Sequence, residues 1–294
     1  MKRFFVWTLA LTLFAPVPRA LGEEQGHKAP AAALKKIPDK LVVLTFDDCN
    51  KSDRVFVADV IRKYGFGATF YVTEGLGFLS NKKNYVTWKE IVELHEMGFE
   101  IGNHTKTHPH MPRLSKAAMI AELLHIEKRC AEHGIPKPGT FCYPGFGNSL
   151  SCVQVLMELG YQFARRGVGP EFKDGGKGAR GPAYDPEEDH PLLVPTTGYA
   201  GPDWKFEDLV WAVERARDGK IAVLCYHGVP ALDHPWVNCD PEAFKKHMRY
   251  LAEQGCTVIA MRDLVNYVDP TRGPADPYAP IRARVAERSG NPGR

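Results

Sequence analysis

The chain has no long apolar run and no strong excess of either charge. Its N-terminal apolar stretch, residues 4–17, spans 14 of the 294 residues, whereas a helix needs about 20 apolar residues to cross a membrane. The net charge is only +3, and no basic cluster is interleaved with aromatic residues. These absences argue against a membrane-spanning helix in the folded part and against nucleic acid as a partner.

The chain also lacks a CxxC pair, which argues against a zinc site built from thiolates. It has seven cysteines, and an odd number in an exported protein leaves at least one thiol unpaired. We expect most of them to act as small buried hydrophobic residues. No cysteine directly follows the apolar stretch, so a lipoprotein is not expected.

The first 22 residues have the features of a secretory signal peptide. Lys2 and Arg3 precede the apolar stretch, and Ala20-Leu21-Gly22 places small residues where a signal peptidase cleaves. We therefore expect a signal peptide at 1–22, a linker at 23–39, and an exported protein in the periplasm or outside the cell. Stable membrane insertion is not expected after cleavage; an uncleaved anchor helix is the alternative.

Between residues 40 and 268, short apolar strands alternate with amphipathic helices. Thr87, with Glu90 three residues later, predicts the start of one helix through a capping box. The strands are expected at residues 41–46, 68–72, 99–102, 140–143, 161–164, 192–194, 221–226 and 257–260. This α/β pattern predicts a single domain with a parallel sheet, open or closed into a barrel. Residues 165–190 are expected to form a long loop, and residues 269–294 a flexible tail.

The polar motifs all follow strands, which favours a barrel with its active site at the carboxyl ends of the strands. Asp47 and Asp48 end the first strand, and His104 and His108 follow the third. Two imidazoles and one carboxylate can hold a divalent cation and leave the other carboxylate free as a base. Pro109 disfavours a helix through His108, so a turn would have to bring the two rings together.

Three further motifs are candidates for chemistry. Residues 141–147, Phe-Cys-Tyr-Pro-Gly-Phe-Gly, follow a strand, and a backbone amide there could hold an oxyanion. Asp203 and Trp204 precede a helix, and an exposed tryptophan beside a cleft commonly supports sugar rings. His227 ends the strongest strand, where it is suited to proton transfer, and His234 is a weaker candidate for the rim of the site.

Taken in order, these segments resemble the polysaccharide deacetylases, carbohydrate esterase family 4, also called the NodB-homology domain. The resemblance covers about residues 40–265 and implies an irregular (β/α) barrel with about seven strands. It implies that Asp47 is the catalytic base, and that Asp48, His104 and His108 bind the metal.

The resemblance extends to the later motifs. It implies that Asp203 orients the catalytic histidine, that Trp204 lines the cleft, and that His227 is the general acid. It also implies that Leu224 lines the acetyl pocket. In the third motif, Tyr143, Pro144, Gly145 and Phe146 are the expected substrate-binding residues, and Tyr143, Gly145 and Phe146 are alternative oxyanion donors.

Two positions depart from the family pattern. Cys49 follows the Thr-Phe-Asp-Asp motif where the family usually has glycine. Cys142 stands where the third motif usually begins with an arginine that pairs with the catalytic aspartate. We expect the pKa of Asp47 to be tuned differently here, with Arg165 or Arg166 as a possible replacement for the cation.

The resulting expectation is a metal-dependent hydrolase that removes N-acetyl groups from amino sugars of a poly- or oligosaccharide. Zinc is favoured by the ligand types, although other first-row ions fit the same set. One alternative is a hydrolase of another bond, such as a cyclic imide or an O-acetyl ester. Two others are a non-catalytic carbohydrate-binding relict and a barrel with a structural metal. The motifs specify neither the glycan nor the oligomeric state.

Overall fold

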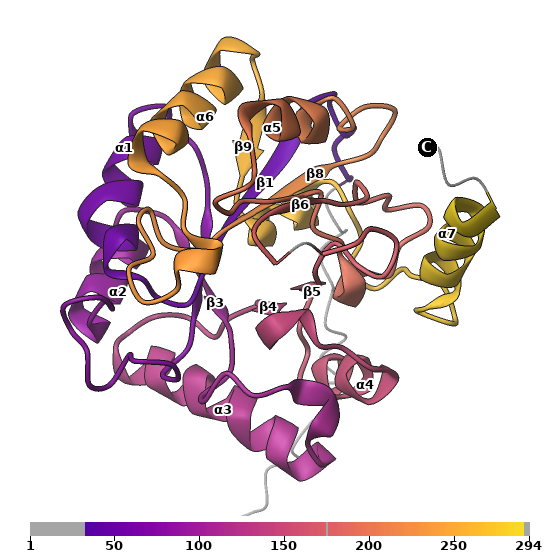
Figure 1. The fold of residues 1–294 in the computed structure, drawn as a ribbon. Coiled ribbons are helices and arrows are strands. Elements are labelled where there is room, and N and C mark those ends of the chain that lie inside the picture. Colours follow the sequence, from indigo (N-terminus) through magenta and orange to yellow (C-terminus); the bar gives the residue numbers. More distant parts are fainter. Residues whose placement is uncertain (1–32, 175, 291–294) are drawn as a thin grey trace, which may run out of the picture. The chain divides into compact units, whose positions relative to one another are not determined.

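Nine strands form one sheet at the centre of the computed structural model, which describes residues 33–174 and 176–290 (Figure 1). The strands are β1 (Leu41–Asp47), β2 (Thr69–Val72), β3 (Glu100–Asn103), β4 (Thr140–Cys142), β5 (Phe163–Arg165), β6 (Ala179–Arg180), β7 (Gly198–Tyr199), β8 (Ala222–Tyr226) and β9 (Thr257–Ile259). Their order is β5-β4-β3-β2-β1-β8-β7-β6, and β9 pairs with β1. All neighbours are parallel except β6 and β7.

Residues 194–197 connect the edge of the sheet at β5 with the strand β8. The amide of Val194 donates to the carbonyl of Ala164 at 2.9 Å, and the amide of Thr197 donates to the carbonyl of Val223 at 2.7 Å. The segment thereby joins β5 to β8 with few regular pairs. The expected irregular (β/α) barrel in a single domain is confirmed.

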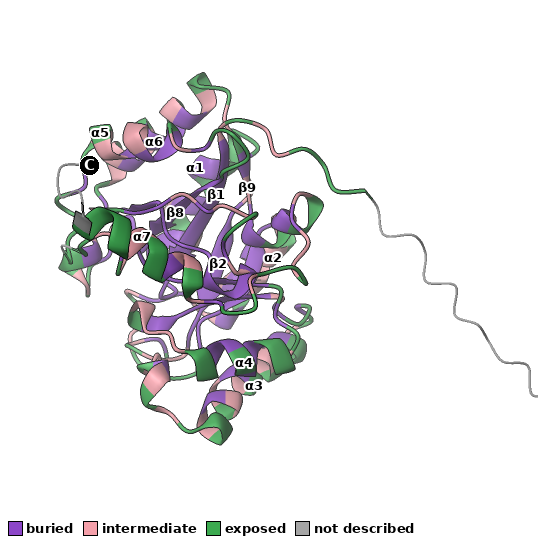
Figure 2. Ribbon diagram, turned by 90° about the vertical axis from the view of Figure 1, so that its right-hand side faces the viewer, coloured by how far each residue is buried: buried purple, intermediate pink, exposed green. Residues whose placement is uncertain are grey.

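Strand β1 shows how the barrel separates its two sides. Val42, Leu44 and Phe46 pack in the core beneath the helices, whereas Leu41 and Val43 pack in a different core within the barrel. Because side chains alternate along a strand, Asp47 lies on the inner side. The last residue of β1 is therefore directed into the barrel, while both faces of the strand are buried (Figure 2).

Helices surround the sheet (Figure 1). They are α1 (Ala58–Arg62), α2 (Trp88–Glu96), α3 (Lys116–Glu132), α4 (Leu150–Glu158), α5 (Phe206–Val213), α6 (Pro241–Glu253) and α7 (Ala279–Gly290). A π-helical turn, Asp53–Val57, leads into α1. The predicted capping box is confirmed: the Thr87 hydroxyl accepts from the amide of Glu90, and the Glu90 carboxylate accepts from the amide of Thr87.

Helix α7 corrects the expectation of a flexible tail from residue 269. Ile281 is 4% exposed and packs in the core that contains Leu192. One turn later, Arg284 forms ion pairs with Glu171, at 3.2 Å, and with Asp189. The proline, glycine and arginine content of this segment suggested a tail, but an apolar and a basic residue on one helix face dock it against the domain.

A second correction concerns the strand expected at 192–194. Pro191–Leu193 forms a 3₁₀ turn, and Val194 makes only an isolated bridge with Arg165. Pro191 fixes its own φ and has no amide to donate, which disfavours regular pairing at this point. The adjoining strand β7 begins only at Gly198.

All seven cysteines are free thiols, and six of them are buried. Among the described residues, no helix is both long and apolar enough to cross a membrane. The expected signal peptide, residues 1–22, lies outside the described residues, as does the linker up to residue 32.

Replacing Thr87 by alanine is expected to lower the free energy of unfolding by about 1 kcal/mol, because the amide of Glu90 loses its acceptor. Urea denaturation measures the change. Thr87→Ser is the matched control, since it retains the hydroxyl group. Equal stability of the alanine and serine variants would contradict the role of this cap.

Candidate metal and catalytic site

Polar side chains from four strand ends meet at one end of the barrel. Asp47 ends β1, His104 follows β3, Cys142 ends β4, and His227 follows β8. A cavity of about 230 Å³ opens there. Its lining comprises Asp47, Asp48, Leu76, His104, His108, Gly145, Phe146, Tyr199, His227, His234, Trp236 and Val237.

The carboxylates of Asp47 and Asp48 have different partners because the chain turns sharply at Asp48 and Cys49. Asp48 and Cys49 both adopt left-handed backbone conformations, with φ of 75° and 58°. Such a conformation costs a residue other than glycine roughly 1–2 kcal/mol. The Cys49 sulfur accepts a hydrogen bond from the Thr73 amide at 3.3 Å, and this contact helps to hold the cysteine where the family usually has glycine.

Asp48 faces the two histidines of the His-Thr-Lys-Thr-His motif. Its Oδ1 lies 3.3 Å from Nε2 of His104 and 3.4 Å from Nε2 of His108. Nδ1 of His104 lies 2.8 Å from the carbonyl oxygen of Cys142 and donates to it, which directs Nε2 toward Asp48. Burial opposes the charged form of His104, but the hydrogen bond with Asp48 and the charge of Asp47 raise its pKa. As expected, a turn and not a helix brings His108 into place, with a φ of 56°.

The donor set of Asp48, His104 and His108 fits a divalent cation. The ligand atoms all lie within 4.8 Å of one another. Among the described residues, Oδ1 of Asp48 is buried without a hydrogen-bond donor. Burial and the neighbouring His104 lower the pKa of His108 to about 4, so this imidazole is neutral at pH 7. Buried acceptor atoms that face one another in this way are stabilised by a bound cation.

Asp47 is paired with an arginine from another strand. The Arg165 guanidinium contacts Oδ2 of Asp47, and its Nη2 lies 2.8 Å from the Cys142 sulfur. Cys142 and Arg165 are register partners on β4 and β5. The small cysteine therefore leaves room for the arginine of the next strand to reach the carboxylate. Of the two arginines considered from the sequence, Arg166 pairs instead with Glu171.

This pairing keeps Asp47 ionised. Burial alone would raise the pKa of Asp47, but Arg165 and the imidazoles of His104 and His227 outweigh burial and hold the pKa below its usual value. Oδ1 of Asp47 is buried and has no partner among the described residues. An ionised carboxylate with a free oxygen beside a metal site can accept a proton.

His227 lies near both carboxylates and faces their Oδ2 atoms. Its Nε2 lies 3.9 Å from Oδ2 of Asp47 and 3.8 Å from Oδ2 of Asp48. Its Nδ1 is buried and has no partner among the described residues. The structure does not bring Asp203 to this nitrogen: Asp203 is exposed in the turn before α5, where its amide donates to the carbonyl of Lys177. The expected orienting contact is therefore not formed.

Trp204 and Leu224 are also placed away from the cavity. Trp204 is 7% exposed and packs edge-on against Tyr226 and His247 beneath the helices. Leu224 belongs to the same core. Since side chains alternate along β8, the inward position is Cys225, whose sulfur lies 3.7 Å from Oδ2 of Asp47. Both side chains face the helices and not the barrel interior, so the structure does not bring Trp204 or Leu224 to the cavity.

The loop after β4 narrows the choice of oxyanion donor. The Tyr143 amide donates to the Arg165 carbonyl at 3.1 Å, and the Phe146 amide donates to the Tyr143 carbonyl at 2.9 Å. Gly145 lines the cavity with Phe146, and among the described residues its amide donates to no turn, loop or cap carbonyl. Pro144 is buried and has no amide hydrogen. Gly145 is thus the available donor of this loop.

The sequence reasoning missed four lining residues, namely Leu76, Tyr199, Trp236 and Val237. Tyr199 is the second residue of β7, a strand of two residues that is too short to show a period. Trp236 lies two positions after His234, which was noted as a rim residue, and this proximity was the only available signal.

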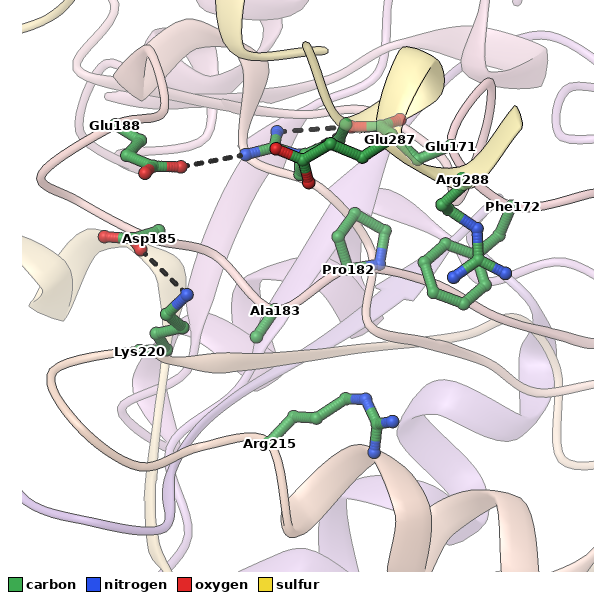
Figure 3. A pocket seen from close by; sticks show the side chains of 11 residues that line it. Glu171, Phe172, Pro182, Ala183, Asp185, Glu188, Arg215, Lys220, Glu287 and Arg288 are labelled. Atoms are coloured by element: carbon green, nitrogen blue, oxygen red, sulfur yellow. Dashed lines mark hydrogen bonds and ion pairs between the residues drawn. The ribbon is translucent and has the colours of Figure 1, made fainter. Parts of the chain in front are cut away.

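A separate cavity of about 300 Å³ lies beside α7 (Figure 3). Charged side chains that line it pair with one another: Lys220 lies 3.1 Å from Asp185, and Arg284 lies 3.7 Å from Glu188. None of the residue groups with metal-ligand spacing in the described chain includes a residue of this cavity. The chemistry is therefore concentrated at the strand ends.

Replacing Arg165 by methionine is expected to lower the free energy of unfolding by about 3–5 kcal/mol at pH 7, because Asp47 is left as a buried unpaired charge. The folded-state pKa of Asp47 is lowered, so its ionisation stabilises the fold above its unfolded-state pKa, and this contribution is lost as the pH falls through the folded-state value. The deficit of the variant should therefore shrink below about pH 4.

Urea denaturation at pH 7 and at about pH 3 measures this difference. The double variant Asp47→Asn/Arg165→Met is the control, since it has no unpaired carboxylate and should recover part of the loss. The same deficit at both pH values would contradict the ion pair as its cause.

Comparison with known proteins gives a family-model match over part of the chain. Residues 35–164 match the family model described as polysaccharide deacetylase. A search of curated proteins found no significant match.

Solved structures with a similar fold include three proteins of carbohydrate esterase family 4. A family 4 carbohydrate esterase from Streptomyces lividans, in complex with acetate, is 19% identical, with 77% of this chain and 93% of that chain covered and a TM-score of 0.50. The Xyl-CE4 domain of a multidomain xylanase from the hindgut metagenome of Trinervitermes trinervoides is 18% identical, with coverages of 77% and 90% and a TM-score of 0.51.

A CE4-family pseudoenzyme from Bacillus anthracis is also 18% identical, with coverages of 78% and 66% and a TM-score of 0.52. At these identities the structural likeness shows the fold, and a pseudoenzyme with the same fold shows that activity must be argued from the site. The comparisons therefore show a match to the polysaccharide deacetylase family model over residues 35–164, and a fold shared with structures of carbohydrate esterase family 4.

Proposed function

We propose that the protein is a metal-dependent hydrolase that removes N-acetyl groups from amino sugars of a poly- or oligosaccharide. The observation that carries this proposal is the pair of adjacent carboxylates with separate partners. Asp48 faces His104 and His108, while Asp47 is held ionised at the edge of the same cavity. The family supports hydrolytic deacetylation as the type of reaction.

Asp48, His104 and His108 would hold a divalent cation, which when bound would activate water and polarise the acetyl carbonyl as a Lewis acid. Two histidines and one carboxylate favour zinc, and other first-row ions are compatible with the same set. Metal analysis of protein purified without a chelator identifies the ion.

The chain's own residues supply the proton transfers. Asp47 accepts the proton of the attacking water through its unpaired Oδ1. The amide of Gly145 donates to the oxygen that becomes negatively charged on the acetyl carbon. Burial lowers the pKa of His227, so His227 receives the proton that Asp47 has taken from water and passes it to the departing amine, from a position within 4 Å of both carboxylates. Acetate and a free amino group result.

An O-acetyl ester is a second candidate substrate. Nδ1 of His227 has no carboxylate partner, because Asp203 lies on the exposed surface. An amine must be protonated as it leaves, whereas an alcohol leaves with less help from a general acid. The unsupported histidine therefore suits an ester, and parallel assays of N-acetylated and O-acetylated glycans distinguish the two bonds. In either case, the expected signal peptide places the substrate outside the cytoplasm.

The variant Asp47→Asn is expected to release acetate at least about 100-fold more slowly than the wild type, because the amide cannot accept the proton of water. Its metal content should be unchanged, since Asp47 is not a ligand. Acetate release from acetylated oligosaccharides and elemental analysis measure the two effects. Asp203→Asn is the matched control, with a rate close to that of the wild type. Near-normal turnover by Asp47→Asn would remove Asp47 from its role.

The variant Asp48→Asn is expected to lose the bound metal and with it the activity. Asparagine tolerates the left-handed backbone at this position and keeps the shape of the side chain, but it removes the negative charge that binds the cation. Elemental analysis should show about one ion per chain in the wild type and a small fraction of that in the variant. Unchanged metal content, with circular dichroism confirming the fold, would reject this ligand set.

A further inference from the structure

Two loops beside the active-site cavity are tied together by side chains. Asp233 accepts hydrogen bonds from Asn81, at 2.8 Å, and from Asn84. The Tyr85 hydroxyl lies 2.8 Å from Nε2 of His234. Tyr85 is 2% exposed, so it anchors His234 to the body of the domain. The segment from Asp233 to Val237 is thereby held as a fixed wall of the cavity.

Trp236 stands on this wall and is half exposed. It lines the cavity, and 52% of its surface is accessible. Its ring packs edge-on against His234, with centroids 5.0 Å apart and planes at 86°. A ring that is held by a tethered neighbour yet left open to solvent is placed for contact with a ligand and contributes little to the core.

The groups around Trp236 suit a sugar ring better than a lipid surface. Nδ1 of His234 makes no hydrogen bond with any described residue, and His234 lines the same cavity. Asn238, next in the chain after the turn, uses its Oδ1 to hold the Ala231 amide. A flat aromatic face beside free hydrogen-bonding groups matches the apolar face and the hydroxyl groups of a saccharide.

The size of the cavity indicates which sugar residue Trp236 contacts. At about 230 Å³ the cavity is smaller than a typical site for a drug-sized ligand, which is about 300–1,000 Å³. It can receive the acetylated part of one sugar residue but not a chain of residues. A ring stacked on Trp236 at the rim therefore belongs to the next residue of the chain.

We propose that Trp236 and His234 form a binding subsite for the sugar residue adjacent to the one that is deacetylated. The substrate is then an oligo- or polysaccharide and not a free monosaccharide. This inference rests on the proposed function, and it assigns to Trp236 the cleft-lining position that Trp204 does not occupy.

Binding to inactive protein separates this inference from the reaction. In the Asp47→Asn background, the β-1,4-linked tetramer of N-acetylglucosamine is titrated by calorimetry. Trp236→Ala is expected to weaken tetramer binding roughly tenfold, which corresponds to about 1.4 kcal/mol. Trp236→Phe should retain most of the affinity because it keeps an aromatic face. Leu79→Ala is the matched control: Leu79 is an exposed apolar residue of the neighbouring loop, 70% accessible, that does not line the cavity.

Kinetics of the active protein provide the second measurement. Trp236→Ala should raise KM for the tetramer roughly tenfold with little change in kcat. An unchanged KM would overturn the subsite, as would wild-type protein that does not bind the tetramer. Loss of binding to phospholipid vesicles in Trp236→Ala, with tetramer binding intact, would assign the ring to a membrane surface instead.

Failure of the subsite and failure of the proposed reaction have different signatures. Tetramer binding that depends on Trp236 without acetate release rejects the reaction and keeps the subsite. Acetate release that is insensitive to Trp236 rejects the subsite and keeps the reaction.

Discussion

The carboxylate of Asp47 and the guanidinium of Arg165 meet inside the barrel, where both side chains are almost fully buried. An isolated charge at this depth costs several kcal/mol, so each of the two groups requires the other. The pair fixes Asp47 in its ionised form and in one orientation. The remaining parts of the site, including the second carboxylate and the three imidazoles, are arranged around this fixed charge.

The carboxylates of Asp47 and Asp48 have different contacts because of the backbone conformation. Residues of β1 alternate between helices and barrel interior, which sends Asp47 toward Arg165. The chain then leaves the extended conformation at Asp48, whose φ is 75°, and this turn sends its carboxylate toward His104 and His108. Two adjacent acidic residues thereby acquire different electrostatic partners without any spacer between them. This arrangement suits the proposed reaction, in which a cation would bind at Asp48 and Asp47 would accept a proton.

The parts of this arrangement that depend on periodicity were predictable from the sequence. The apolar run before Asp47 and the capping box at Thr87 are local patterns, and they locate a strand and a helix within a few residues. The meeting of Asp47, Asp48, His104 and His227 followed from placing each motif after a parallel strand, because such strand ends lie at one edge of the sheet.

The structure differs from the sequence-based expectations where a property depends on the direction in which one side chain points. Leu224 and Cys225 differ by one position, and only the register of β8 decides which of them faces Asp47. Trp204 and Asp203 follow a strand of two residues, so no pattern in the sequence fixes their orientation. Arg165 and Arg166 were equivalent candidates until the pairing of β4 with β5 assigned one to each side of the strand.

The state of the cysteines has a practical consequence. No pair of the seven thiols is joined, and burial raises the pKa of Cys49, Cys142 and Cys225 well above the usual value. Thiols that are neutral and shielded from solvent react slowly with oxidants. The domain therefore needs no cross-linking step to reach its native form, so it can be produced in the reducing interior of an ordinary bacterial expression host and refolded with reductant present.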